Sequence, residues 1–491
     1  MIYRILVAAA IVVLAAGPAS AQLFSLINQS VSNITGTGAR AHGMGGAFIA
    51  LADDATAASW NPAGLAQLNR PEVSVVYEDF SGSYDTSQLV VEDYTAFEPF
   101  PFSFRSTIDS PGEFESSNLA FVSATYPFRI GKTPLVTQAS YRRMASFPNL
   151  KRAGGTLSQL LDGDGNPLDQ FETTINSDDQ FQGGFDAYTI SIATQLGGKV
   201  RLGLSANYID IDIRNQYQSV EVEVDDPSQC WRCSSIDGRE SFSDWNFDLG
   251  IQWQPIRALT FGGVYHSAFS TDYKYTVTNQ RSFYDPRSGS VVEYVPSTSS
   301  GDTTVHYPDG WGAGVAWRST DRLTFAVDYS KMYWSKGRVE AVRRPGWTPD
   351  GTPIARRPQE LGFPFPFDQD DSWTARVGGE YVFMLKSGLV LPVRAGYFQE
   401  KQFAAFSDLV EVGDAPTFTG YTLGTGFAYK SIQFDIAWVH TTGEDSRSDS
   451  YSFPETFIVD GEPYEFIVDV TETRTVDYSS DRFLASFMVR F

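Results

Sequence analysis

The sequence predicts an all-β protein: a 14-stranded antiparallel transmembrane β-barrel with an N-terminal hatch (plug) inside the lumen. Three observations carry this prediction: an export signal, strands with one bulky apolar face, and connections that alternate between short and long. The chain has 491 residues, of which 42% are hydrophobic and 14% aromatic. No apolar run reaches the roughly 18 residues that a membrane-spanning helix needs, which excludes a helical membrane protein.

Residues 1–21 have the three parts of a secretory signal peptide. Arg4 supplies the positive charge, residues 5–16 form the apolar stretch, and Ala19-Ser20-Ala21 is an A-x-A cleavage site. No cysteine follows the cut, so a lipid anchor is not expected. We therefore predict export through a cleaved signal peptide in a Gram-negative bacterium.

Most of the remaining chain alternates bulky apolar residues with small, polar or charged ones. Trp245, Phe247, Leu249, Ile251 and Trp253 alternate with Asn246, Asp248, Gly250 and Gln252. Aromatic residues at both ends of such a strand are typical of the girdles where an outer-membrane barrel leaves the lipid. Fourteen segments follow this pattern, beginning near Glu72, Asn118, Leu135, Phe185, Lys199, Asp244, Ala258, Gly310, Asp321, Ser372, Leu389, Phe418, Ser431 and Arg482.

The connections between these segments alternate in length. Six are short, and seven are long, near 79–117, 147–183, 213–243, 274–309, 335–371, 402–417 and 441–481. An outer-membrane barrel with both ends in the periplasm has short periplasmic turns and long outer loops. Residues 71–491 are therefore predicted to form the barrel with seven long extracellular loops. The chain ends on Phe491, as many outer-membrane barrels do.

Residues 22–70 lack strand alternation and are rich in small residues. The glycines indicate tight turns, and we expect a short helix over 52–59 that ends before Asn61-Pro62, because a residue preceding proline avoids the helical region. Gly43-Met44-Gly45 is not a dinucleotide loop, since Phe48 stands where the third glycine belongs. A segment of this size can fill the lumen of a wide barrel.

The run from Gly38 to Gly64 resembles the FadL/TodX family of outer-membrane transporters for hydrophobic compounds. The resemblance rests on Gly43, Gly45, Gly46, Asp53, Asp54, Asn61, Pro62 and Gly64. It implies that 22–70 is a hatch, that a long-chain fatty acid or similar hydrophobe rearranges its N-terminal end, and that the ligand leaves sideways into the membrane. In such proteins the third strand carries the lateral opening. PorV-like barrels, which serve protein secretion and surface attachment, show much the same run and remain the alternative.

Two sets of residues are candidates for binding the ligand. Aromatic–proline runs in two long loops are typical of exposed apolar binding surfaces, although the same residues can also pack together over the barrel mouth. Their members are Phe100, Phe102, Phe104, Phe363, Phe365 and Phe367. A fatty-acid carboxylate is best recognised by a lumenal guanidinium, and the candidates are Arg142, Arg201, Arg376 and Arg394. The competing role for each arginine is an ion pair across the lumen with Asp248, Asp328, Glu380 or Asp435, or with Asp53 and Asp54.

Two smaller motifs have structural interpretations. Cys230 and Cys233 form a C-x-x-C that predicts a local disulfide in an exported protein. Residues 162–169 resemble half of a calcium loop, but Pro167 replaces the central glycine and Thr173 the final glutamate, which favours a solvated acidic turn.

Charge and motif content narrow the function. A net charge of −22 and a pI near 4.6 disfavour a nucleic-acid partner. Neither G-x-S-x-G nor H-E-x-x-H occurs, so an enzyme is not expected, and no cofactor or metal site is predicted. We predict a monomeric outer-membrane barrel, in contact with lipid and lipopolysaccharide, that takes up hydrophobic small molecules passively. The alternatives are the PorV-like secretion partner and a general water-filled porin, which a hatch would obstruct.

Overall fold

The computed structural model describes most of the chain after the N-terminus. The described residues are 35–94, 102–162, 165–223, 230–285, 290–293, 296–340, 346–347, 353–354, 364–366, 371–401, 417–459 and 462–491. The predicted signal peptide and residues 22–34 of the predicted hatch lie outside them. Among the described residues, no helix is long and apolar enough to cross a membrane.

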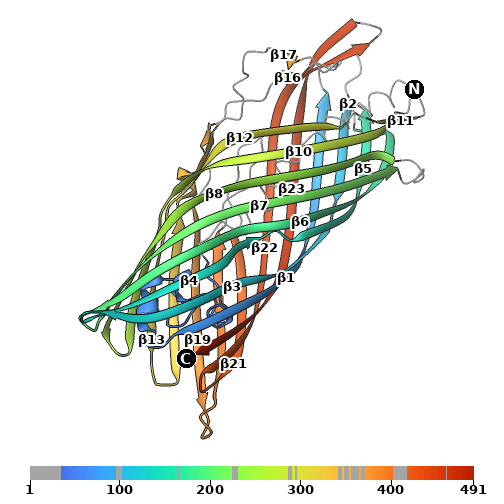
Figure 1. Cartoon of the computed structure of the whole chain (residues 1–491). Helices are drawn as coiled ribbons and strands as arrows, with labels where there is room; N and C mark the ends of the chain where they lie inside the picture. Colours follow the sequence, from blue (N-terminus) through green and yellow to red (C-terminus); the bar gives the residue numbers. More distant parts are fainter. Residues whose placement is uncertain are drawn as a thin grey trace.

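An antiparallel sheet closes on itself as a barrel (Figure 1). Closure comes from β1 (Glu72–Tyr94), which pairs on one side with β3 (Gly112–Ile130) and on the other with the last strand, β23 (Glu462–Arg490). A closed sheet leaves no row of unpaired backbone groups, which lipid would not tolerate. The other strands are β2 (Phe102–Asp109), β4 (Thr133–Ser146), β5 (Asn149–Asp162), β6 (Pro167–Leu196), β7 (Val200–Glu223), β8 (Cys230–Ile256), β9 (Leu259–His266), β10 (Phe269–Asp285), β11 (Ser290–Glu293), β12 (Ser297–Tyr307), β13 (Gly310–Arg318), β14 (Leu323–Met332), β15 (Arg338–Glu340), β16 (Gly346–Trp347), β17 (Pro353–Ile354), β18 (Pro364–Pro366), β19 (Ser372–Met384), β20 (Val390–Lys401), β21 (Thr417–Tyr429) and β22 (Ile432–Val459).

The closed barrel has 16 strands, with three more outside it, so the predicted number of 14 is wrong. Strands such as β2 and β5 come from stretches that the sequence analysis assigned to loops. They pair with each other, and β2 also pairs with β1. Pro111 separates β2 from β3 and Pro148 separates β4 from β5. A proline cannot donate a ladder hydrogen bond, and each of these two lies in a break between two separately paired strands, within a stretch predicted as a long loop.

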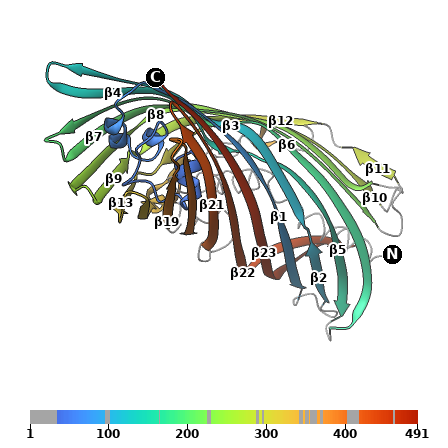
Figure 2. The ribbon, with the colours of Figure 1, turned by 90° about the horizontal axis from the view of Figure 1, so that it is seen from below.

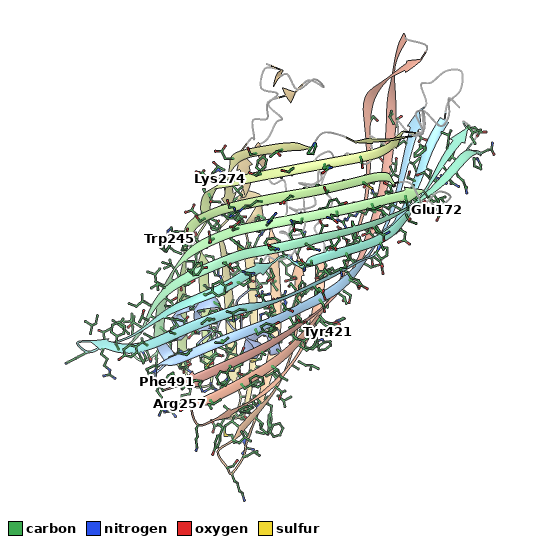
Figure 3. The ribbon with its side chains drawn as sticks, turned by 45° about the vertical axis from the view of Figure 1, so that its right-hand side comes forward. Glu172, Trp245, Arg257, Lys274, Tyr421 and Phe491 are labelled. Carbon is green, nitrogen blue, oxygen red and sulfur yellow. The ribbon has the colours of Figure 1, made fainter. Side chains whose placement is uncertain are left out.

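The outward face of the strands is apolar over a limited height. On β8, Trp245 points outward (Figure 3). Trp245, Leu249 and Trp253 are about half exposed, whereas Asp248 and Gln252, on the other face of the strand, are buried. Tyr208 of β7 packs against Trp245 with ring centroids 5.3 Å apart. This arrangement is the apolar band with aromatic girdles that a barrel presents to lipid.

Beyond Trp245 the polarity of the two faces inverts. On β7, Ile209, Ile211 and Ile213 are buried on the lumenal side, while Asp212 and Arg214 are exposed outside. An apolar inner face with a polar outer face is the pattern of a sheet surrounded by water. The barrel wall therefore continues beyond the lipid, and β6 with its 30 residues far exceeds the 9–11 residues that cross a bilayer. Much of the chain assigned to long loops is this extension.

The described part of the N-terminal segment, residues 35–70, lies inside the barrel near the end that carries the C-terminus (Figure 2). It contains α3 (Ala39–Gly43) and two 3₁₀ helices, η1 (Ala57–Ser59) and η2 (Pro62–Gln67). The helix expected over 52–59 is reduced to η1, because Asp54 accepts hydrogen bonds from the Thr56 amide and hydroxyl and forms a turn there. Asn61 caps η2, with Pro62 in its first position.

Candidate ligand cavity beside the N-terminal segment

The barrel wall and the N-terminal segment meet backbone to backbone. A Cβ on Gly250 of β8 would overlap Asn61 Oδ1, and one on Gly378 of β19 would overlap the Met44 carbonyl oxygen. Only glycine allows the segment to approach these strands so closely. The residues of the family resemblance lie at this contact: Gly45 and Gly46 adopt positive φ angles of 68° and 74°.

Polar side chains complete the contact. Asp328 of β14 accepts hydrogen bonds from the Phe48 and Ile49 amides at 2.6 and 2.7 Å. Asn61 donates to the carbonyl of Ile49 and, across to the wall, to that of Ile251 at 3.1 Å. The segment is rich in tight turns, and these bonds satisfy backbone groups that its own helices leave unpaired.

A cavity of about 130 Å³ lies between this segment and the surrounding strands. This volume holds several water molecules or a small polar head group, but not a long acyl chain. Its polar lining includes Arg142, Arg376 and Arg482, and the carboxylates Glu78 and Glu400; its apolar lining includes Phe80, Phe398, Met144 and Val439. Thr35, Gly36, Thr37 and His42 belong to the N-terminal segment and also line it.

Two of the four predicted arginines lie at this cavity. Arg142 donates to the Ser59 carbonyl at 3.2 Å and, among the described residues, forms no ion pair. Arg376 donates to the hydroxyls of Ser330 and Thr35 at 3.1 and 3.2 Å. Both guanidinium groups thus connect the wall to the segment and present positive charge to the cavity.

The other two arginines are engaged elsewhere. Arg394 pairs with Glu380 at 2.6 Å and with Asp435 at 2.7 Å. It therefore has the alternative role named for these arginines, an ion pair with a lumenal carboxylate. Arg201 donates to the side-chain oxygen of Gln254 at 2.9 Å. Neither is among the residues that line the cavity.

An apolar cluster lies next to the cavity along the lumen. Phe185, Phe242 and Phe269 surround Tyr307, and the rings of Phe269 and Tyr307 stack with centroids 4.6 Å apart. Met144 and Ala145 belong to both places, since they line the cavity and pack in this cluster. The sequence analysis missed these residues, although the inverted alternation from Ile209 to Arg214 was visible in the sequence.

The sheet is interrupted beside the cavity. β3 pairs with β4 as far as Phe121 with Arg142, and pairing resumes as Glu115 of β3 with Asn149 of β5. Within these described strands, residues 116–120 have no ladder partner on that side. The Asn118 amide bridges the interval by donating to the Ser146 hydroxyl at 2.7 Å. The backbone pairing of the wall is therefore interrupted where Met144 and Ala145 line the cavity.

His42 is the titratable group of the N-terminal segment at the cavity. Burial, with Arg482 and Arg376 nearby, lowers its pKa to about 3, although a contact with the Gly36 carbonyl opposes this. The ring lies edge-on to Trp60 with centroids 5.8 Å apart. His42 is therefore neutral at neutral pH and donates through Nε2 to the Gly36 carbonyl at 3.2 Å.

The aromatic–proline residues and the two minor motifs are only partly described. Phe104 is buried on β2, whereas Phe100, Phe363, Phe367 and the side chains of Phe102 and Phe365 lie outside the described residues. Cys233 is disulfide-bonded, but the side chain of Cys230 is not described, so their pairing stays a prediction. The Asp162 carboxylate accepts from the Asn166 amide at 2.8 Å, and no described group of three His, Cys, Asp or Glu residues is arranged to hold a metal ion.

A second groove lies on the opposite side of the wall. It measures about 840 Å³ and lies among outward residues such as Leu204, Ile251 and Tyr265. Its lining carries no charged residue. We assign it to the lipid-facing surface and place the candidate ligand site in the lumen, where charge and apolar surface meet.

Comparison with solved structures identifies the fold. A Pseudomonas aeruginosa FadL homologue matches with a TM-score of 0.53 and 12% identity, covering 94% of this chain and 99% of that chain. The P. putida toluene transporter TodX matches with a TM-score of 0.50 and 14% identity, again covering 94% and 99%. The chain has the FadL/TodX barrel fold. No protein-family model and no curated protein matches the sequence.

The resemblance stated for Gly38–Gly64 is thus confirmed at the level of the fold. At 12–14% identity the likeness to the FadL homologue and TodX carries no residue roles. The roles of the hatch motif, the arginines and the phenylalanines remain predictions.

Proposed function

We propose that this protein is an outer-membrane transporter that takes up hydrophobic small molecules passively, with long-chain fatty acids as its ligand class. The observation that supports this most is the meeting of Arg142, Arg376 and Arg482 with an apolar lumenal cluster. A fatty acid needs both surfaces, because its carboxylate requires charged donors and its chain gains about 0.8 kcal/mol for each buried methylene. The monomeric state and contact with lipopolysaccharide are part of the same proposal.

The route has three steps. The acyl chain lies along the cluster of Phe185, Phe242 and Tyr307, and the carboxylate reaches Arg142. Because Arg142 holds the Ser59 carbonyl, a ligand that recruits this guanidinium weakens a contact of the N-terminal segment, which acts as a hatch. The ligand then leaves sideways through the interval between β3 and β4. The interrupted pairing at residues 116–120 supports this exit.

The test compares Arg142→Gln with Arg201→Gln, a lumenal arginine away from the cavity. Purified proteins in mild detergent are titrated with oleate and with toluene. Since a hydrogen bond to a charged group contributes about 1.5–3 kcal/mol, Arg142→Gln should weaken oleate binding by roughly 10–150-fold. Toluene has no carboxylate and should bind the variant and the wild type equally.

Other results point elsewhere. Equal oleate affinity in a folded Arg142→Gln barrel would remove this arginine from the site. Binding of toluene but not oleate to the wild type would indicate neutral hydrocarbons. A wild type that binds neither, but purifies with a stoichiometric protein, would favour the PorV-like secretion role.

A further inference from the structure

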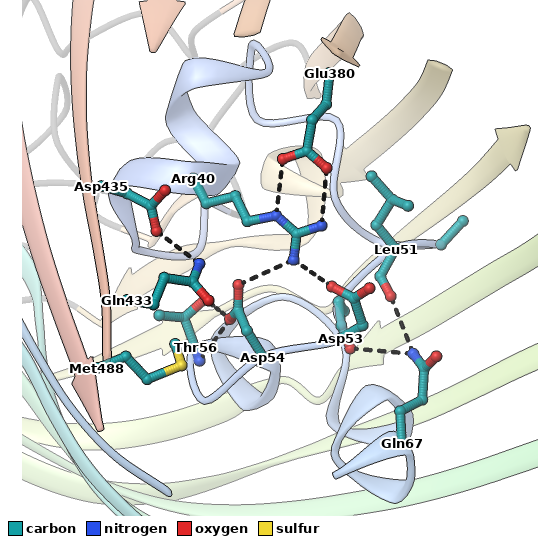
Figure 4. Close-up of polar contacts among 12 residues, drawn as sticks. Arg40, Leu51, Asp53, Asp54, Thr56, Gln67, Glu380, Gln433, Asp435 and Met488 are labelled. Atoms are coloured by element: carbon teal, nitrogen blue, oxygen red, sulfur yellow. Dashed lines mark hydrogen bonds and ion pairs between the residues drawn. The ribbon is translucent and has the colours of Figure 1, made fainter. Parts of the chain in front are cut away.

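One cation of the N-terminal segment is held by three carboxylates. Arg40 of α3 donates through Nε and Nη2 to the two oxygens of Glu380 on β19, each at 3.2 Å (Figure 4). Its Nη1 contacts Asp53 and also Asp54, the latter at 3.5 Å. Burial alone lowers the pKa of Arg40, but Asp53, Glu380 and Asp54 together raise it well above its usual value. We call Arg40 with Asp53, Asp54 and Glu380 the clamp.

The clamp continues into the barrel wall. Glu380 also accepts from Arg394, which pairs with Asp435 of β22. Asp435 accepts from Gln433, and Gln433 accepts from Arg490, which pairs with Glu72 at 2.8 Å. This chain of bonds runs from the N-terminal segment to β23 and β1, the two strands that close the barrel. Displacing Arg40 would remove the cation that faces the buried Asp54 and would leave Glu380 with Arg394 alone, which is costly.

The residues before α3 are held much less firmly. Thr35 receives a hydrogen bond from Arg376, and the Thr37 amide donates to Ser59 Oγ at 3.0 Å. The Thr37 carbonyl accepts from Trp60 Nε1 at 2.8 Å, and the Gly36 carbonyl accepts from His42 Nε2 at 3.2 Å. None of these bonds joins two opposite charges. Gly38, between this strip and Arg40, has a φ of 113°, a conformation that L side chains rarely adopt. Hydrogen bonds that do not join two opposite charges are weaker than paired buried charges, so the strip at 35–37 can detach while the clamp holds.

We infer that Arg40 is the positioning residue that keeps residues 39–70 seated, so that the clamp, and not the cavity arginines, limits leakage through the resting barrel. This inference rests on the proposed role of the segment as a hatch. Two properties then depend on different residues: the cavity arginines govern ligand binding, and the clamp governs the leakage of ions through the resting barrel.

The test measures potassium chloride conductance of the full-length protein in planar bilayers, with oleate binding in parallel. Arg40→Gln should raise the fraction of time spent conducting by at least about 100-fold, because a buried pair has lost one partner. Oleate affinity should stay within about twofold. Arg40→Lys, which keeps the charge but not the two-pronged contact, should lie between Arg40→Gln and the wild type. Arg214→Gln removes an exposed pair with Asp237 and should leave conductance unchanged.

Folding is checked for each variant by the heat-dependent change in gel mobility of closed barrels. If Arg40→Gln does not fold, Glu380→Gln, a wall residue of the same size, takes its place with the same expectation. Wild-type conductance in folded Arg40→Gln or Glu380→Gln would overturn the inference. If both clamp variants conduct like the wild type while Asn61→Ala, which loosens a different contact of the segment, raises conductance, only the inference about the clamp is refuted. If Asn61→Ala does not leak either, the hatch role of the proposed function fails as well.

Discussion

Asn61 offers the sharpest test of how the N-terminal segment is seated. Its side chain is fully buried and forms three hydrogen bonds. Nδ2 donates to the carbonyls of Ile49 and Ile251 at 3.0 and 3.1 Å, and Oδ1 accepts from the Ala63 amide at 3.1 Å. Asn61→Ala removes all three, including the one that reaches the barrel wall.

The size of the effect follows from these contacts. A buried neutral hydrogen bond contributes about 1 kcal/mol net, so three amount to roughly 3 kcal/mol. Each 1.4 kcal/mol changes an equilibrium tenfold, and the ratio of seated to unseated segment should fall by roughly 100-fold. The loss of the helix cap lies within the same sum, because the bond to Ala63 is the cap itself.

Amide hydrogen exchange followed by mass spectrometry measures this ratio. Exchange of peptides that cover residues 57–68 should accelerate by roughly 100-fold in Asn61→Ala if opening limits exchange. Asn69→Ala is the matched control, because Asn69 is exposed and donates only to the Gln67 carbonyl. Exchange at the wild-type rate in Asn61→Ala, with Asn69→Ala also unchanged, would show that these bonds do not hold the segment.

Two further predictions follow from the lipid-facing band and from His42. Leu249→Arg places a charge midway between Trp245 and Trp253 and should reduce the free energy of unfolding in liposomes by about 2–4 kcal/mol. Ser241→Arg, which lies beyond the band, should reduce it by under about 1 kcal/mol. Equal losses in the two variants would refute the assigned depth. His42 has a folded pKa of about 3, below its unfolded value, so its contribution to seating is present above pH 6.5 and is lost as the pH falls from 6.5 toward 3. Conductance should therefore rise between pH 7 and 4.5 in the wild type and change less in His42→Gln; identical pH profiles would refute this.

The strands in the lipid were predictable because lipid imposes a simple pattern. Trp245–Trp253 and Phe483–Phe487 alternate so regularly that the sequence locates β8 and β23 and their outward faces. Where water replaces lipid, the pattern inverts, and a search for apolar outward faces assigns the strand to a loop. This is why β2 and β5 were missed and the strand number came out as 14 in place of 16. On β7, Ile209, Ile211 and Ile213 alternate with Asp210, Asp212 and Arg214. This inverted alternation is the sequence signal of a strand that continues beyond the lipid.

The site was harder to predict because its partners are distant in the sequence. Arg142 and Arg376 could be proposed from strand alternation alone, but nothing local distinguishes them from Arg394. Their difference arises from register: Glu380 lies opposite Arg394 in the β19–β20 ladder, while Arg142 lies opposite Phe121. Arg40 was not singled out, since its partner Glu380 is 340 residues away. Only tertiary structure brings these charges together.

The distribution of charge inside the lumen bears on the exit route. A hydrophobe that continued past the cavity toward the C-terminal end would meet the clamp, where Arg40, Glu380 and Asp435 are already paired and buried. Inserting an acyl chain there would separate paired charges without offering apolar surface in return. At Met144 and Ala145 the opposite holds. An acyl chain there would contact apolar side chains, and residues 116–120 of the neighbouring β3 have no ladder partner on that side. Each methylene that reaches lipid through that interval recovers the roughly 0.8 kcal/mol that burial in the lumen supplied. If the clamp closes the lumen as we propose, the same paired charges favour sideways release over passage toward the C-terminal end.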